Sequence, residues 1–168
     1  MISKSSTNTL LSQTAEYALR AMVLLAEAGG GPLTTQSIAQ QAKIPTGYLS
    51  KILRKLSKGG LLRAQRGIGG GFALCLACEK ISALDVVTTV DGGVSRITAC
   101  PLGNPAHAGL CPLHRMIDRA TADVETALAS TSLADLTRAE RTCCRSTTAV
   151  NPSLSPPIEP GADCPPSV

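Results

Sequence analysis

The sequence from residue 44 to residue 76 is IPTGYLSKILRKLSKGGLLRAQRGIGGGFALCL. Its first half predicts an amphipathic helix over 47–58 with Thr46 as its cap, because apolar residues recur at helical spacing. These apolar residues are Leu49, Ile52, Leu53 and Leu56. Its second half has two β-prone pieces, 61–65 and 71–76, on either side of a glycine-rich turn. The stretch therefore predicts one helix followed by a two-stranded hairpin.

Two helices are expected before this stretch. Apolar periodicity predicts one over 15–28 and a second over 36–42, with Thr34 or Thr35 as the cap of the second. Pro45 leaves room only for a tight turn before the third helix. Helix, helix, tight turn, helix and hairpin follow one another in the order of a winged helix-turn-helix. The predicted fold class is mainly α with a small β-hairpin wing.

The second half of the chain predicts further helices around an irregular loop. Helical periodicity is found over 81–90, with Ser82 as the cap, and again over 113–129 and 133–141. The helix at 113–129 is long and follows a globular module, so we expect its apolar seam to meet a second chain. The expected division is a winged helix-turn-helix DNA-binding domain at 11–91, a Cys/His sensor loop at 92–112, a dimerisation helix region at 113–141 and a disordered proline-rich tail at 142–168.

Charge is distributed unevenly along the chain. The net charge is only +4, but no acidic residue occurs between Glu27 and Glu79. That interval carries seven basic residues, Lys43, Lys51, Arg54, Lys55, Lys58, Arg63 and Arg66. A positive field without internal anions suits a polyanion, because each Lys or Arg at a phosphate releases condensed counterions. Aromatic residues make up only 2% of the chain, which argues against a single-strand binder that stacks bases. Duplex DNA is the partner indicated, and an ordinary solvated helix face is the alternative.

The candidate DNA contacts lie on the helix and hairpin of residues 44–76. Since the major groove of B-DNA accepts one α-helix, polar groups in the first turn would read bases and later cations would bind phosphates. The glycine-rich tip lets the backbone approach the minor groove while Arg66 reaches into it. The glycines lack the Gly-Lys-Ser/Thr that a nucleotide-binding P-loop requires. The candidates are Thr46, Gly47, Tyr48, Ser50, Lys51, Arg54, Lys55, Arg63, Arg66, Gly69 and Gly70.

Several protein classes are disfavoured by composition. No uninterrupted apolar run approaches the length of a membrane span, and residues 1–13 lack the order of a signal peptide. No nucleophile and base form a convincing pair, so the chain is not expected to be an enzyme. We expect a cytoplasmic protein without membrane contact.

Four residues have the spacing of a metal or cluster site. Cys100, His107, Cys111 and His114 form C-x6-H-x3-C-x2-H, and thiolates and imidazoles bind zinc and iron–sulfur clusters. Cys111 and His114 are three residues apart at a predicted helix start, so both can face one site. Simpler interpretations remain open: unligated thiols, a surface histidine at 107 and an ordinary polar residue at 114.

The other five cysteines carry weaker signals. A single C-x2-C at Cys75 and Cys78 does not support a zinc ribbon. Alternation along a strand would turn the two thiols to opposite faces, which favours buried apolar thiols. No role is assigned to Cys143, Cys144 or Cys164.

Several motifs in fixed order resemble a known family. They are AEYALR at 15–20, IAQQ at 38–41, IPTGYL at 44–49, RGIGGGFAL at 66–74, ISALDVV at 81–87 and the stretch 100–114. Over residues 11–140 the chain resembles the IscR- and NsrR-type (Rrf-type) winged-helix transcription regulators. The resemblance implies a homodimer joined by the long helix, binding to palindromic promoter DNA, and often an iron–sulfur cluster.

The cysteine loop departs from the pattern of many cluster-binding relatives. Those relatives have three cysteines here, whereas this chain has two, with His107 near the middle position. The resemblance also implies that a carboxylate of the partner's first helix can be a ligand, and Glu16 holds the matching place. A 2Fe–2S cluster held by Cys100, Cys111, a histidine (His107 or His114) and Glu16 is therefore expected, with a plain ion pair of Glu16 as the other interpretation.

The expected function is that of a dimeric, sequence-specific regulator of transcription. It would act as a repressor on double-stranded promoter DNA, and its Cys/His loop would sense redox state, iron or nitric oxide through the cluster. One alternative keeps the fold without a cofactor and lets the thiols respond by modification. Another is a small metalloenzyme or electron carrier that uses Cys100 and Cys111.

Overall fold

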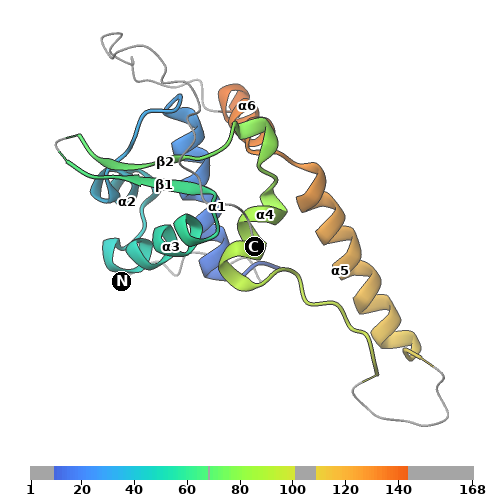
Figure 1. The fold of residues 1–168 in the computed structure, drawn as a ribbon. Helices are drawn as coiled ribbons and strands as arrows, with labels where there is room; N and C mark the ends of the chain where they lie inside the picture. Colours follow the sequence, from blue (N-terminus) through green and yellow to red (C-terminus); the bar gives the residue numbers. More distant parts are fainter. Residues whose placement is uncertain (1–9, 68, 101–108, 144–168) are drawn as a thin grey trace, which may run out of the picture.

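The computed structural model of the chain describes residues 10–67, 69–100 and 109–143. These residues form a helical body that carries a two-stranded hairpin on one side, and one long helix projects from it (Figure 1). The helices are α1 (Gln13–Glu27), α2 (Thr35–Ala42), α3 (Thr46–Lys58), α4 (Ala83–Asp91), α5 (Pro112–Ser130) and α6 (Leu133–Cys143). The strands are β1 (Leu62–Gln65) and β2 (Gly71–Leu74), and a single 3₁₀ turn, η1, spans Cys78–Lys80. The predicted fold class is confirmed.

The core forms around α1. This helix contacts α2, α3, α4 and α6, and Met22 and Leu25 on its inner face are buried with Ile38 of α2 and Leu53 of α3. Removing such apolar side chains from water contributes roughly 1.5–3 kcal/mol each. The periodic residues of α3 are all buried, as the sequence predicted. Their burial fixes which face of α3 remains exposed.

Short polar side chains set where most helices start. Thr34 accepts a hydrogen bond from the Ser37 N–H at 3.1 Å, and Ser82 forms a capping box with Asp85. The Thr46 cap was wrong, because Thr46 is the first residue of α3 and no side chain caps this helix. The carbonyl of Pro45 already accepts the Leu49 N–H at 3.0 Å, so the helix begins one residue earlier than predicted.

The wing is a short antiparallel hairpin held to the body by a third segment. Leu62 pairs with Leu74, and Leu33 forms an isolated bridge to Phe72 through hydrogen bonds of 2.8 and 2.9 Å. A Cβ at Gly71 would lie 2.2 Å from the Leu33 carbonyl oxygen, so only glycine allows this close approach.

The second strand is shorter than predicted. It ends at Leu74, where the Cys75 N–H turns to the Leu61 carbonyl at 3.0 Å. Strand alternation therefore does not apply to Cys75 and Cys78, which are half-buried rather than buried. The prediction of two buried apolar thiols on opposite strand faces was wrong.

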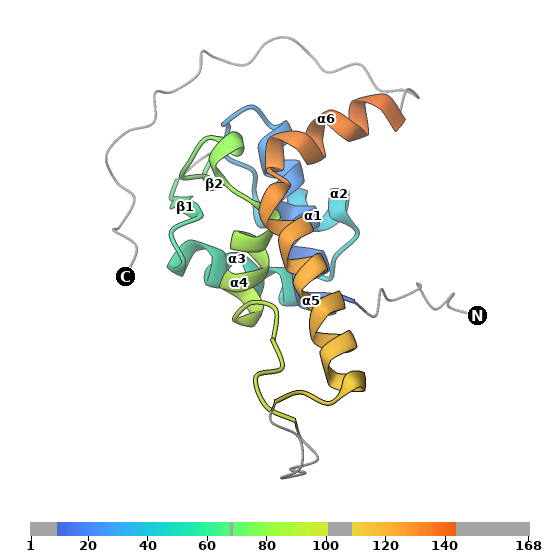
Figure 2. The same cartoon turned by 90° about the vertical axis from the view of Figure 1, so that its right-hand side faces the viewer.

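The last two helices behave differently from each other. α6 packs on α1 and η1 through the fully buried Leu133, whereas α5 lies along the outside of the body and extends beyond it (Figure 2). No side chain of α5 is buried, although the structure describes the whole helix. Within the described residues, neither α5 nor any shorter helix combines the length and apolarity needed to cross a bilayer. Most of the predicted tail, from residue 144, lies outside the described residues.

Candidate nucleic-acid interface and sensor site

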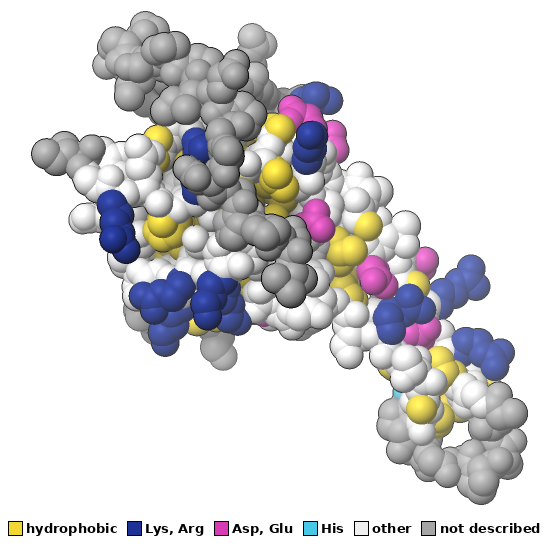
Figure 3. Space-filling view, in the orientation of Figure 1, with side chains coloured by type: hydrophobic (Ala, Val, Ile, Leu, Met, Phe, Trp, Pro, Cys, Tyr) yellow, Lys and Arg dark blue, Asp and Glu magenta, His cyan; other side chains and the backbone are white. Residues whose placement is uncertain are grey.

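The outer face of α3 is polar and basic. Gly47, Lys51, Arg54 and Lys58 are exposed on the side opposite the buried leucines. Figure 3 shows Lys and Arg side chains gathered over the α3 side of the molecule, whereas the Asp and Glu side chains visible in that view lie towards α4, α5 and α6. Because α3 is amphipathic and contributes no acidic group, its free face has the charge that duplex phosphates attract.

The first turn of α3 is fixed against α1. The Tyr48 hydroxyl lies 2.6 Å from Thr14 Oγ1, and the Tyr48 ring meets the Tyr17 ring edge-on with centroids 5.8 Å apart. Tyr48 keeps 38% of its surface exposed. The contacts with α1 therefore hold the aromatic residue in place at the exposed start of the helix, a role the sequence did not reveal.

Lys55 has a structural partner. Its ammonium donates to the Val90 carbonyl at the end of α4, at 2.7 Å. A cation there satisfies one of the carbonyls that a helix end leaves unpaired. Lys55, one of the candidate DNA contacts, therefore also joins α3 to α4.

A hollow lies between α3 and the wing. It has a volume of about 450 Å³ and is lined by Thr35, Ser50, Arg54, Ser57, Lys58, Ala64 and Phe72. Two of these residues are cations and three are hydroxyl-bearing, so the hollow offers donors to an anionic group. Thr35, the first residue of α2, borders the same hollow.

The hairpin tip also presents basic and glycine residues. Arg66 and Gly69 are exposed, while Arg63 and Gly70 are half-buried. A Cβ at Gly70 would lie 2.4 Å from the Gln65 carbonyl oxygen, so the tip closes on itself only with glycine at this position. Every candidate DNA contact predicted from the sequence is described by the structure, on α3 or on the hairpin.

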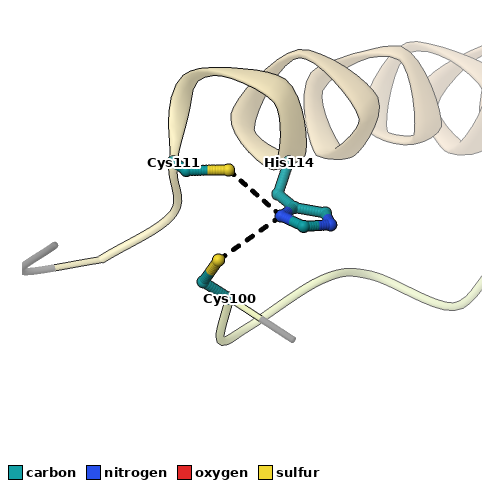
Figure 4. A group of neighbouring side chains, drawn as sticks. All are labelled: Cys100, Cys111 and His114. Atoms are coloured by element: carbon teal, nitrogen blue, oxygen red, sulfur yellow. Dashed lines mark hydrogen bonds between the residues drawn. The ribbon is translucent and has the colours of Figure 1, made fainter. Parts of the chain in front are cut away.

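Three of the predicted sensor residues meet at the start of α5 (Figure 4). Sγ of Cys111 lies 3.1 Å from Nδ1 of His114, and Sγ of Cys100 lies 3.4 Å from the same nitrogen. The three donor atoms all lie within 4.8 Å of one another. Cys111 is the N-cap of α5, with Pro112 in the first turn. Two soft thiolates and an imidazole suit zinc or an iron–sulfur cluster.

The two other predicted ligands are not in this group. His107 lies outside the described residues. Glu16, on α1, forms an ion pair with Arg20, whose guanidinium also lies 5.7 Å from the Tyr17 ring centroid. Within one copy of the chain Glu16 is thus an ion-pair partner, and its predicted role as a ligand requires a second copy.

Sequence reasoning missed an ion pair beside the sensor residues. Arg96 donates to both carboxylate oxygens of Asp118, at 2.7 Å each, and the Ile97 N–H donates to Asp118 Oδ1 at 3.0 Å. The Arg96 hydrogen bonds are the main reason that the pKa of Asp118 falls to about 2. No periodic or motif signal marks Arg96, because its partner is 22 residues away in sequence.

Reactive thiols have a lowered pKa, whereas the surroundings of Cys78 act in the other direction. Burial, followed by the neighbouring Glu79 carboxylate, raises the pKa of the Cys78 thiol. It therefore stays protonated at neutral pH and is a weak nucleophile.

The helical order, the hairpin wing and the exposed basic face together define a winged-helix DNA-binding protein. Comparison with known proteins agrees: the Rrf2 family, described as an iron-dependent transcriptional regulator, matches residues 11–139. The chain belongs to the Rrf2 family of transcriptional regulators. The resemblance to IscR-type regulators is thus confirmed, as is the prediction that the chain is not an enzyme.

Individual relatives support the same assignment. The chain is 35% identical over 128 residues to a candidate HTH-type transcriptional regulator of Mycobacterium tuberculosis, covering 75% of this chain and 80% of the relative. It is 35% identical over 85 residues to the regulator IscR of Aliivibrio salmonicida, covering 50% of this chain and 51% of that protein. The solved structure of CymR, the global cysteine regulator of Bacillus subtilis, superimposes with a TM-score of 0.66 at 29% identity, covering 77% of this chain and 96% of CymR.

Proposed function

We propose that the chain is a homodimeric, sequence-specific repressor that acts on promoter DNA in the cytoplasm and whose Cys100–Cys111–His114 site senses redox state, iron or nitric oxide. The exposed, anion-free face of α3 and the wing is the observation that carries this proposal. The proposed organisation is a DNA-binding domain at 11–91, a sensor loop at 92–112 and a dimerisation region at 113–141.

Each part of the basic face has an assigned role on DNA. The first turn of α3 enters the major groove, where the Thr46 and Ser50 hydroxyls, the exposed part of Tyr48 and the Gly47 backbone approach base edges. Lys51, and to a lesser extent Lys55, bind backbone phosphates. The hollow beside Arg54 receives a phosphate, and the wing places its glycine tip and cations along the minor groove. The wing residues are Arg63, Arg66, Gly69 and Gly70.

Dimerisation explains the exposed seam of α5. Leu113, Met116 and Ile117 keep 55%, 63% and 40% of their surfaces exposed and lie close together on the first turns of the helix. A contiguous apolar patch of this kind marks an interface. A second copy packed on it would bring two α3 helices to the same DNA face, about 34 Å apart when they occupy successive major grooves.

An iron–sulfur cluster is the proposed sensor, with 2Fe–2S as its type. Cys100, Cys111 and His114 hold it, and the remaining ligand comes from His107 or from Glu16 of a second copy. Such a cluster changes oxidation state and reacts with nitric oxide or oxidants. The family description as iron-dependent and the soft donor set support this assignment.

A thiol switch without a cofactor is the second candidate. The sulfur atoms of Cys100 and Cys111 lie within 4.8 Å of each other, so a modest shift would join them. Two electrons and two protons would pass from the thiols to a peroxide, which leaves as water.

Oxygen-free purification separates the two candidates. The cluster predicts a coloured protein with iron and sulfide in equal amounts, and substituting Cys111→Ser would remove both. A colourless protein that forms a Cys100–Cys111 disulfide with peroxide supports the thiol switch instead. Failure of the purified chain to bind its own upstream DNA, even at low salt, would overturn both.

The dimer is tested on the same protein. Met116→Glu places a charge in the seam and should halve the mass measured by sedimentation equilibrium. Asp123→Asn, an exposed change on the same helix, serves as the control, and equal masses for the two variants would contradict an α5 interface.

A further inference from the structure

Residues 92–100, the described part of the chain that follows α4, are attached to α5 at two places. At the first, Arg96 forms a bidentate ion pair with Asp118, and its other terminal nitrogen reaches Glu125 Oε2 at 3.4 Å. At the second, Cys100 Sγ meets His114 Nδ1 at 3.4 Å. We call the Arg96–Asp118 pair, together with the Ile97 N–H bond to the same carboxylate, the clasp.

The two attachments are in register with each other. Asp118 follows His114 by one helical turn, so both lie on the same face of α5. Arg96 precedes Cys100 by the same number of residues on the segment, which runs antiparallel to the helix. Both Figure 1 and Figure 2 show this segment running beside α5. The position of Arg96 along α5 therefore limits where Cys100 can lie.

Few hydrogen bonds of its backbone hold residues 94–99 in place. Among the described residues, the main-chain groups of 94–99 make one hydrogen bond, from the Ile97 N–H to Asp118. Asp118 keeps 18% of its side-chain surface exposed, less than the 42% of Arg96, so the carboxylate is the more sheltered partner. A bidentate arginine–carboxylate pair fixes the relative orientation of its two partners as well as attracting them. An irregular segment otherwise lacks such a fixed orientation.

We propose that the clasp is a positioning device that holds Cys100 opposite Cys111 and His114, so that the donor site is assembled before a metal, cluster or oxidant arrives. This inference rests on the proposed sensor function of that site. Arg96 and Asp118 are positioning residues and supply no ligand. Without the clasp, Cys100 would sample more positions, and each binding event would have to restrict it again.

Cobalt binding to the full-length, reduced, metal-free protein measures this contribution. Co²⁺ bound by thiolates absorbs in the visible and near-ultraviolet, and the part of the spectrum that Cys111→Ser abolishes belongs to this site. Arg96→Ala and Asp118→Asn should weaken this binding about twofold to fivefold, the upper part of the range expected for removing an exposed but well-oriented ion pair. The spectrum at saturation should be unchanged, because the ligands are the same. The cobalt affinity of Arg96→Lys should lie between that of the unmodified protein and that of Arg96→Ala.

Thiol bridging provides a readout without metal. Dibromobimane becomes fluorescent when it links two nearby thiols, and peptide mass spectrometry locates the link between Cys100 and Cys111. The rate should fall in Arg96→Ala and Asp118→Asn by a similar factor. Arg119→Ala and Asp123→Asn are matched controls, since these exposed α5 residues make no ion pair with any described residue. Both controls should behave as the unmodified protein.

The outcomes separate the clasp from the sensor function. Unchanged cobalt affinity and unchanged bridging in both clasp variants would overturn the clasp and leave the proposed function standing. If the unmodified protein shows no Cys111-dependent cobalt spectrum, the metal-sensing proposal fails, and the bridging rates still decide whether the clasp positions Cys100. An altered spectrum at saturation would show that the clasp residues act as ligands, which contradicts the proposal.

Discussion

At the scale of single residues, the burial of the apolar side chains of α3 determines which of its polar side chains are exposed. Four residues of α3 are buried in the core, which leaves Lys51, Arg54 and Lys58 exposed. Lys55 is exposed too, yet its ammonium is held by the end of α4. We therefore propose Arg54 in preference to Lys55 as a DNA contact, although the two are adjacent in sequence.

Arg54→Ala and Arg66→Ala should weaken binding to promoter DNA and make it less dependent on salt. Removing the charge at one phosphate should reduce the slope of log K against log salt by about 0.9. Fluorescence anisotropy at several salt concentrations measures both effects. Arg138→Ala on α6, away from the basic face, is the control; equal slopes in all variants would contradict the assignment.

The clasp should stabilise the folded protein at neutral pH and lose this effect as the pH falls. The pKa of Asp118 falls from an ordinary value of 3.8 to about 2, chiefly through its Arg96 hydrogen bonds. Its contribution to stability is therefore complete above the unfolded pKa and is lost as the pH falls from 3.8 towards 2. Thermal unfolding should show Arg96→Ala less stable than the unmodified protein at neutral pH, with a difference that shrinks over this interval. A difference that stays constant down to pH 2 would contradict this cause.

At the scale of elements, the wing depends on one close approach of backbones. The Leu33–Phe72 bridge joins the hairpin to the segment before α2, and a Cβ at Gly71 would lie 2.2 Å from the Leu33 carbonyl oxygen. Because the Leu33 carbonyl and the Gly71 main chain are both backbone groups, neither can move aside without breaking the Leu33–Phe72 bridge.

Gly71→Ala should destabilise the folded protein. Forcing a methyl into this contact should lower the free energy of unfolding by roughly 1–3 kcal/mol. Gly47→Ala is the control, since a Cβ there meets nothing within 4 Å. Chemical denaturation of both variants makes the comparison, and a Gly71→Ala variant as stable as Gly47→Ala would show that the bridge is not tight in solution.

Local patterns predicted the elements better than they predicted the contacts between them. The helical repeat and the caps at Thr34 and Ser82 are local, so the sequence located these helices to within a few residues. The Leu33 bridge and the Arg96 clasp join residues far apart in sequence, and no local pattern encodes them. The meeting of Cys111 with His114 was predicted because the two are three residues apart at a helix start, and Cys100 was grouped with them by its spacing. The geometry of the clasp beside them was not predicted.

At the scale of the whole molecule, the basic face of α3 and the proposed sensor site lie far apart in the fold. α3 belongs to the helical body, whereas Cys111 and His114 lie at the end of α5 that extends from it (Figure 1). The segment that carries Cys100 leaves α4, and α4 is joined to α3 through Lys55. α4 and α5 are therefore the physical connection through which the state of the sensor would reach the DNA-binding face.

The most direct test is the affinity for the promoter duplex of the oxygen-free, metal-loaded protein compared with the same protein after chelation. We expect the two affinities to differ by about fivefold or more, the scale of ordinary coupling between sites. The difference should disappear in Cys111→Ser, which lacks one of the three donor atoms. Identical affinities for the loaded and stripped forms of the unmodified protein would contradict a sensor that controls DNA binding.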